Sequence, residues 1–314
     1  MTEILLNALV PVFVVMGLGY FAGWVRDVDN HHVAELNALV MDFALPCALF
    51  VATATTSQSV MLAQWPLLLV LVVAMLLVYG ACYWMQRRLF GLDSKASAVQ
   101  TLTISLPNYA AIGLPLIPAV LGASDTFYVA LAIASGSIFP SPLTLSILEA
   151  AKSAEQGKMN VGHVIGAVGR AFLKPIVLGP ILGVIYSFVG LPMPVYLIHA
   201  FQLIGAAAGG VALFLTGLIL SSQRILLNWN VVSGTLIKLV VQPLLGLVII
   251  ALVPMAHDTA RAAILLLAEP AGFFGVLFGL RYGVESHEAG STLLVSSVLS
   301  IMTLAVALVL TGGS

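Results

Sequence analysis

Apolar stretches of about 20 residues recur along the whole chain, and each is long enough to cross a hydrocarbon core of roughly 30 Å as a helix. We place them at 4–24, 33–55, 64–86, 96–121, 126–149, 162–188, 195–221, 229–254, 260–282 and 289–311. Only 8% of the residues are charged, against roughly 25% in a soluble domain. The sequence therefore predicts an all-α membrane protein of about ten transmembrane helices.

Positive charge is distributed unevenly between the connections. Only Arg261 flanks an even-numbered connection, whereas the odd-numbered ones have many basic residues in or beside them: Arg26, Arg87, Arg88, Lys95, Lys152, Lys158, Arg224 and Arg281. By the positive-inside bias, the odd connections are cytoplasmic, so both termini lie outside. No run of like charge predicts a nucleic-acid partner, and membrane lipid is the expected surrounding.

The two halves of the chain match each other. An offset of 164 positions superimposes Pro11 on Pro175, Gly19 on Gly183, Ala48-Leu49-Phe50 on Ala212-Leu213-Phe214, and Trp65 on Trp229. We expect a first five-helix repeat at 1–152, a cytoplasmic linker at 153–160 and a second five-helix repeat at 161–314. Repeats of five spans have opposite topology, and inverted repeats place a substrate site near the midplane, where paired broken helices meet.

The fourth and ninth spans each contain helix-breaking residues at membrane depth. The fourth has Pro107, Asn108, Tyr109 and Gly113, and at an offset of 162 the ninth brings Glu269, Pro270 and Gly272 to similar depth. Proline forces a helix to open, and the freed backbone groups suit a carboxylate ligand. The alternative is a proline kink that Ser105 and Asn108 patch without any ligand.

Four other polar side chains lie within the spans and are candidates for coupling or charge pairing. Glu269 could carry a proton or bind a cation, unless it lies close enough to the surface to be wet. Lys238, roughly 13 Å deep, shares a helical face with Gln242. We favour pairing of Lys238 with Asp42 or Glu269 over direct binding of the substrate.

Hydroxyl groups in the fifth and tenth spans supply further candidates, of which we select Ser137 and Ser297 for the substrate site. Serine in a membrane helix is also a common packing residue. The histidines are scattered, and no GxSxG, HExxH or P-loop motif occurs, so we expect no enzyme activity, no cofactor and no metal site. Sodium could still bind through backbone carbonyls near the breaks.

Motifs along the whole chain resemble the auxin efflux carrier family, and within it the bacterial malonate branch. They include Met41-Asp42-Phe43-Ala44-Leu45-Pro46, Leu106 to Pro115, Lys174-Pro175, Gly179-Pro180, Ala212 to Gly217, Lys238 with Gln242-Pro243, and Ala271 to Val276. The resemblance implies a bile-acid-symporter-like fold. Its scaffold would consist of spans 1, 2, 6 and 7, its mobile core of spans 3–5 and 8–10, and homodimers would form through the scaffold.

The resemblance also implies a function: crossed breaks in spans 4 and 9 would hold the substrate while the core moves like an elevator. Where plant carriers have an asparagine beside the ninth-span proline, this chain has Glu269, which favours coupling to protons or sodium. We expect malonate uptake by secondary active transport. The alternatives are a carrier of succinate or an auxin-like acid, a non-transporting membrane sensor with the same fold, or, least favoured, an intramembrane enzyme.

Overall fold

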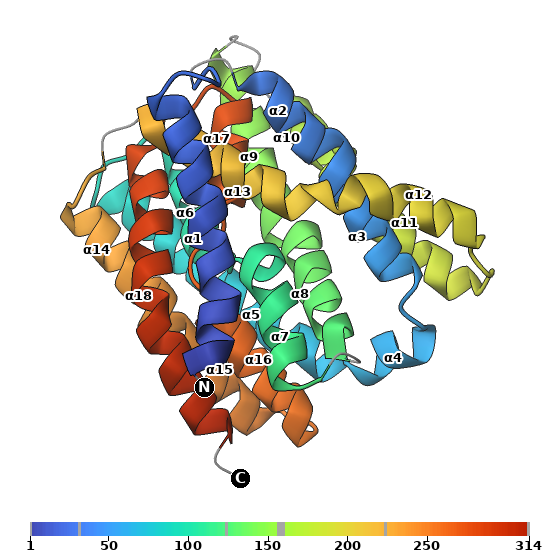
Figure 1. Cartoon of the computed structure of the whole chain (residues 1–314). Coiled ribbons are helices and arrows are strands. Elements are labelled where there is room, and N and C mark those ends of the chain that lie inside the picture. Colours follow the sequence, from blue (N-terminus) through green and yellow to red (C-terminus); the bar gives the residue numbers. More distant parts are fainter. Residues whose placement is uncertain (1, 31–32, 123–124, 156–160, 223–224, 313–314) are drawn as a thin grey trace.

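The structure is a computed structural model that describes residues 2–30, 33–122, 125–155, 161–222 and 225–312. The chain is folded as a bundle of helices (Figure 1). Within the described residues, the one β-bridge joins Pro107 and Ala271 in antiparallel orientation. Most of the predicted linker at 153–160 lies outside the described residues, as do Lys158 and Arg224.

The first half of the chain contains nine α-helices and two π-helical turns among its described residues. They are α1 (Thr2–Trp24), α2 (Ala34–Ala38), η1 (Leu39–Ala44), α3 (Leu45–Ala54), α4 (Gln58–Ala63), α5 (Trp65–Arg88), α6 (Ser94–Ser105), η2 (Tyr109–Gly113), α7 (Leu114–Val120), α8 (Thr126–Ile138) and α9 (Pro140–Glu155).

The second half has a similar succession of helices. Its elements are α10 (Val161–Phe172), α11 (Pro175–Val189), α12 (Val195–Gly205), α13 (Ala207–Ser222), α14 (Trp229–Leu236), η4 (Ile237–Val241), α15 (Gln242–Leu252), α16 (His257–Ala268), α17 (Phe274–Arg281) and α18 (His287–Gly312).

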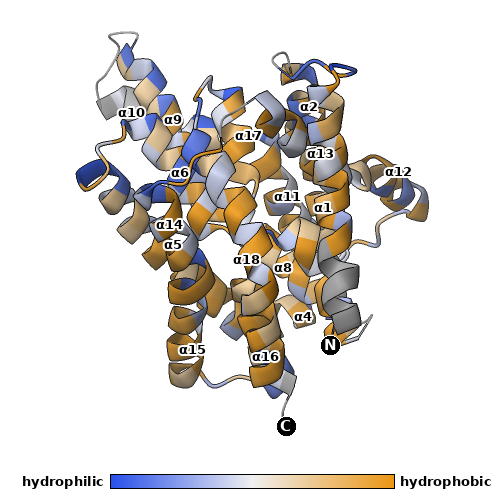
Figure 2. Ribbon diagram, turned by 60° about the vertical axis from the view of Figure 1, so that its left-hand side comes forward, coloured by the Kyte–Doolittle hydropathy of each residue, from blue (hydrophilic) through white to orange (hydrophobic). Residues whose placement is uncertain are grey.

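Six helical runs among the described residues are long and apolar enough to cross a membrane. They are Ala34–Ala54, Trp65–Arg88, Phe127–Glu155, Val195–Ser222, Trp229–Leu252 and His287–Thr311. Shorter apolar helices lie at Val10–Trp24, Tyr109–Val120 and Pro175–Val189. Figure 2 shows hydrophobic residues along the shafts of α1, α15, α16 and α18, and hydrophilic ones mainly near the ends of the bundle. The chain is thus a multi-pass helical membrane protein.

The sixth predicted span, 162–188, is wrong as a single continuous helix. Lys174 is extended (φ −66°, ψ 137°), and it separates α10 from α11, which begins at Pro175. Proline lacks the backbone donor that would continue the preceding turn, and it disfavours the helical conformation of the residue before it. As a result α10 packs against α9, whereas α11 packs against α3.

Two helix pairs pack at very short range through glycine. Gly19 of α1 lies against the backbone of Phe214 in α13, and Gly183 of α11 lies against the backbone of Phe50 in α3. A side chain at either glycine would collide with main-chain atoms, which cannot move aside as a flexible side chain can. The offset of 164 that relates Gly19 to Gly183 also relates Phe50 to Phe214, so the two contacts have the same form.

The two ends of the bundle are distinguished by their loops. α1 begins and α18 ends at the same end of the molecule, where α4 also lies (Figure 1). The opposite end carries α2, α10 and the last turn of α17. Connections at the same end of the bundle therefore lie on the same surface of the protein.

Candidate substrate site at two crossing helix breaks

Two interrupted helices meet in the middle of the bundle. α6 ends at Ser105 before η2 begins at Tyr109, and α16 ends at Ala268 before α17 begins at Phe274. The helices therefore break where Pro107 and Pro270 predict, since proline cannot continue the hydrogen-bond ladder.

The two breaks are bonded to each other through their backbones. The N–H of Asn108 donates to the carbonyl of Pro270 over 3.0 Å, and the N–H of Gly272 donates to the carbonyl of Thr103 over 3.2 Å. A Cβ at Gly272 would lie 2.5 Å from the carbonyl oxygen of Leu106, so this crossing requires glycine. Irregular backbone at membrane depth is tolerated when its polar groups are satisfied inside the protein.

Lys238 and Gln242, on neighbouring turns of η4 and α15, bind the ends of both interrupted helices. The ammonium of Lys238 donates to the carbonyl of Leu267 over 3.0 Å and to Oε1 of Gln242 over 2.7 Å. The amide of Gln242 donates in turn to the carbonyl of Ser105 over 2.7 Å. Both side chains are fully buried, so together they satisfy terminal carbonyls of α6 and α16.

Ser296 of α18 supports the second break, a contact that sequence reasoning did not single out. Its hydroxyl accepts a hydrogen bond from the N–H of Ala271 over 3.1 Å. The predicted site residue Ser297 donates instead to the carbonyl of Leu293 in its own helix over 2.7 Å. The two serines are adjacent, and their sequence positions alone do not tell which one faces the break.

Several buried polar atoms at the crossing have no hydrogen-bond partner among the described residues. Both amide atoms of Asn108, both carboxylate oxygens of Glu269 and the hydroxyls of Ser105 and Ser137 belong to this group. Asn108 is 2% exposed and Glu269 is 0% exposed, so Glu269 is not wet. Buried polar groups are ordinarily hydrogen-bonded, so these atoms indicate a place for a ligand, a cation, a proton or water.

Gly113 of η2 gives the Glu269 carboxylate its place beside the first break. A Cβ at position 113 would lie 2.8 Å from Oε1 of Glu269. The carboxylate of one break thus lies against the backbone that follows the other. This contact explains why a glycine at position 113 belongs to the site although it carries no functional group.

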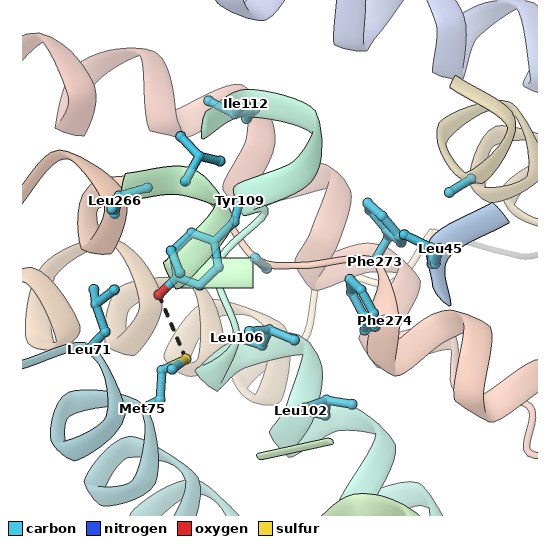
Figure 3. Packing of buried hydrophobic residues seen from close by; sticks show 14 of the residues in the cluster. Leu45, Leu71, Met75, Leu102, Leu106, Tyr109, Ile112, Leu266, Phe273 and Phe274 are labelled. Carbon is cyan, nitrogen blue, oxygen red and sulfur yellow. Dashed lines mark hydrogen bonds between the residues drawn. The ribbon is translucent and has the colours of Figure 1, made fainter. Parts of the chain in front are cut away.

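The hydroxyl of Tyr109 has a sulfur atom as its hydrogen-bond partner and also interacts electrostatically with Glu269. The hydroxyl lies 3.7 Å from the sulfur of Met75 in α5, in the apolar cluster shown in Figure 3. Phe273 and Phe274, which stack with ring centroids 5.1 Å apart, follow the second break. Tyr109 therefore lies at the crossing, with its ring packed in the core and its hydroxyl in contact with the sulfur of Met75.

A cavity of about 670 Å³ leads from one end of the bundle toward the crossing. It lies between α3, α12 and α13 on one side and α8 and η2 on the other, and its lining includes Thr56 and Ser57 near α4. Ala110 and Ile133 line both this cavity and a void of about 10 Å³ beside Pro107 and Ser137. The larger cavity therefore reaches the edge of the crossing, where the remaining space is small.

Asp42 does not take part in the crossing. Its carboxylate pairs with the guanidinium of Arg281 at the end of α17 over 2.5 Å, and both side chains are partly exposed. The predicted pairing of Asp42 with Lys238 is therefore wrong, whereas the other predicted partner, Glu269, does interact electrostatically with Lys238. Distance along a span gives the depth of a side chain but not the helix that it faces.

A second polar cluster, also missed by sequence reasoning, lies near the same end as Arg281. Glu149 of α9 accepts a hydrogen bond from the hydroxyl of Tyr282 over 2.6 Å. It also pairs with Lys174 over 3.1 Å and with Arg170 over 3.3 Å. This cluster joins α9 and the end of α17 to α10 and the start of α11.

The site holds few metal-ligating side chains. No group of three or more His, Cys, Asp or Glu residues gathers within the part of the chain that the structure describes. A cation at the crossing would therefore depend on Glu269 and on backbone or amide oxygens. Such oxygens suit a hard cation, including the sodium ion of carriers with broken helices, better than a soft transition metal.

Interrupted helices that cross within a multi-pass bundle, beside a cavity open to one end, define the architecture of a membrane transporter. The model of the membrane transport protein family matches residues 4–308. The chain belongs to this auxin efflux carrier-like family, as its motifs predicted. It is therefore a membrane transporter and not an enzyme.

Two relatives cover nearly the whole chain. One, "Uncharacterized transporter YfdV" of Escherichia coli strain K12, is 27% identical over 306 residues, which are 96% of this chain and 96% of the relative. The other, "Putative malonate transporter" of Rhizobium meliloti strain 1021, is 24% identical over 299 residues, which are 94% of this chain and 92% of the relative.

Proposed function

We propose that the protein is a secondary active carrier of a small dicarboxylate, with malonate as the first choice, and that the two crossing breaks bind the substrate. The observation that carries this proposal is the set of unpartnered polar atoms on Asn108 and Glu269 at the end of a large cavity. Similarity to a protein named as a malonate transporter favours malonate among the dicarboxylates.

Two inverted five-helix repeats would create the crossing. The matched contacts of Gly19 with Phe214 and of Gly183 with Phe50 support this arrangement, because one offset converts each into the other. In this scheme α1, α3, α11 and α13 belong to the scaffold and the helices around the crossing belong to the core. The cavity lies between these two groups, where an elevator movement would expose the site to alternate sides.

The breaks offer donors to an anion. Helix starts carry partial positive charge, and the second halves of both interrupted helices begin beside the crossing. The proposed substrate site consists of the residues Pro107, Asn108, Tyr109, Gly113, Ser137, Pro270, Gly272 and Ser297. Asn108 would donate its amide to one carboxylate, with Ser137 on the neighbouring helix α8.

Charge requires a coupling ion for concentrative uptake. Malonate carries two negative charges near neutral pH, and a membrane potential of about 100 mV, negative inside, opposes its entry by roughly 2.3 kcal/mol for each charge. Protons or sodium ions would balance these charges. Glu269 is the proposed carrier of the coupling ion, because its carboxylate is buried and makes no hydrogen bond among the described residues.

The proposed setting is a bacterial inner membrane with both termini outside. The cavity would then open to the outside, since it extends toward the end of the bundle where α4 and both chain ends lie. Dimers would form through the scaffold helices. Many of the outward side chains of α11 and α12 are large and apolar, including Phe188, Tyr196 and Leu203, so this surface fits either lipid or a second copy.

The lining of the cavity favours a second candidate substrate. Most of its wall is apolar, with Leu45, Leu49, Phe127 and Ile133, and none of the described residues that line it is charged. A monocarboxylate with an apolar body, such as an auxin-like acid, would bury its body there and place its single charge at the breaks.

Counterflow in proteoliposomes tests both candidates. In separate preparations, purified protein is reconstituted with unlabelled malonate, succinate, a monocarboxylate or an aromatic acid inside. Uptake of the same acid in labelled form is then followed, with each of the other acids as a competitor. Strongest competition by malonate supports the first candidate, and strongest competition by the aromatic acid supports the second. If no acid supports counterflow and none stabilises the protein against heat, the protein is better interpreted as a non-transporting sensor.

A further inference from the structure

Between the two helix breaks, the side chain of Lys238 fills the place that a bound cation would take. Lys238 and Gln242 bind terminal carbonyls of α16 and α6. The ammonium of Lys238 donates to the carbonyl of Leu267 over 3.0 Å, and the amide of Gln242 donates to the carbonyl of Ser105 over 2.7 Å. Each helix end carries partial negative charge, equivalent to roughly half an elementary charge. The partial negative charge of the two helix ends therefore favours a cation between them.

Lys238 supplies that cation from within the protein. Its side chain is 0% exposed, and its ammonium has one amide oxygen and one carbonyl oxygen as partners. The buried carboxylate of Glu269 interacts electrostatically with Lys238 but forms no hydrogen bond with it or with any other described residue. The ammonium is thus held by helix-end and amide oxygens, the kinds of oxygen that bind sodium in carriers with broken helices.

We propose that Lys238 is a resident cation of the crossing, which occupies the place of a coupling metal ion and makes transport independent of sodium. This inference rests on the proposed carrier function, and it narrows the coupling ion to the proton. The ammonium stays with the protein throughout the cycle, so it stabilises the crossed helix ends without being transported.

The first test uses the wild-type protein in proteoliposomes. Malonate counterflow is measured with sodium and with sodium fully replaced by choline at equal ionic strength. Equal rates are expected, because no site is left for sodium between the helix ends. A drop of about tenfold or more without sodium, equivalent to about 1.4 kcal/mol, would overturn the proposal while leaving the carrier function intact.

The second test removes the ammonium and supplies it from solution. Lys238→Ala is expected to lose counterflow by about tenfold or more, and methylammonium is expected to restore a large part of it, whereas choline is too large to enter. Counterflow imposes no proton gradient, so the amine cannot act by dissipating one. Failure of methylammonium to restore activity in a folded Lys238→Ala protein would contradict the proposal.

A matched control comes from the neighbouring side chain. Gln242→Ala removes a buried hydrogen-bonding group from the same cluster but leaves the Lys238 charge in place. Methylammonium should not restore its activity. If the amine helps both variants equally, it fills a void and does not replace a charge, and the proposal is wrong.

A thermal measurement keeps the proposal separate from the substrate question. Methylammonium should raise the unfolding temperature of Lys238→Ala in detergent and leave the wild type and Gln242→Ala unchanged. If no acid is transported, the proposed function fails, and this measurement still decides the role of Lys238. If Lys238→Ala does not fold, Lys238→Arg replaces it as the test variant, because arginine keeps a cation at this place. Its counterflow should be independent of sodium or, if no acid is transported, its unfolding temperature should be unaffected by sodium. Dependence of either quantity on sodium would contradict the proposal.

Discussion

The backbone of Asn108 is bonded to that of Pro270, 162 positions further along the chain, by a hydrogen bond of 3.0 Å from N–H to carbonyl. Because the main chain of Asn108 supports the crossing, its side chain is free for another role. Both of its amide atoms are buried without a partner among the described residues. The residue that joins the breaks thus also presents donors and an acceptor beside them.

Asn108→Ala should abolish substrate binding without unfolding the protein. The variant keeps the backbone bond to Pro270 and removes only side-chain atoms that make no hydrogen bond within the described structure. We expect counterflow to fall by about tenfold or more, the equivalent of about 1.4 kcal/mol, with little change in the unfolding temperature. Unchanged counterflow would exclude Asn108 from the site, and a large loss of folded yield would indicate a structural role instead.

Glu269→Gln should separate exchange from driven uptake. The amide keeps the size of the carboxyl group beside Gly113 but can neither gain nor lose a proton at neutral pH. Counterflow is expected to persist, and uptake driven by an imposed proton gradient is expected to disappear. Glu285→Gln, at an exposed position, serves as the control and should behave as wild type in both assays.

Adjacent serines in α18 should differ sharply in their contribution to stability. Ser296→Ala leaves the N–H of Ala271 without its acceptor, and an unsatisfied buried donor costs about 1–3 kcal/mol. Ser297→Ala removes a bond to a carbonyl of its own helix and should cost less. Thermal unfolding in detergent measures both, and an equal effect would show that the second break does not depend on Ser296.

A cysteine in the cavity should report which side of the membrane the cavity faces. Ala52 lines the cavity, and Ala52→Cys in a variant lacking Cys47 and Cys82 should react in intact cells with a membrane-impermeant maleimide. Bound substrate should slow the reaction. Glu285→Cys, at an exposed position just before α18, which begins at the opposite end of the bundle, should react only after the cells are opened; the reverse pattern would invert the proposed topology.

Two nearby glycines of α1 should respond oppositely to the same substitution. Gly19→Ala places a methyl group against the Phe214 backbone, whereas Gly17→Ala has nothing within 4 Å of the new atom. The first change should reduce folded yield and unfolding temperature. The second should be neutral or stabilise the helix by about 0.5–1 kcal/mol, since alanine favours helix over glycine. If both substitutions change the unfolding temperature equally, α1 and α13 can separate with little loss of stability.

The sequence predicted the parts of this structure that depend on local chemistry. Pro107 and Pro270 interrupt their helices because proline does so in any context. The partners of Lys238 depend on which helices lie beside it, so the prediction of Asp42 was wrong and the carbonyl of Leu267 was not foreseen. The helix break before Pro175 could have been predicted from the proline, but continuous hydrophobicity concealed it.

The ion pair between Asp42 and Arg281 and the cluster around Glu149 lie toward one end of the bundle, where water and salt have access. If the core moves as proposed, these contacts must separate in every transport cycle, so they form part of its activation barrier. Dissolved salt screens partly exposed charges over distances of about 10 Å or less at physiological concentration. The ionic strength on that side of the membrane would then tune the turnover rate, even though the substrate never touches these residues.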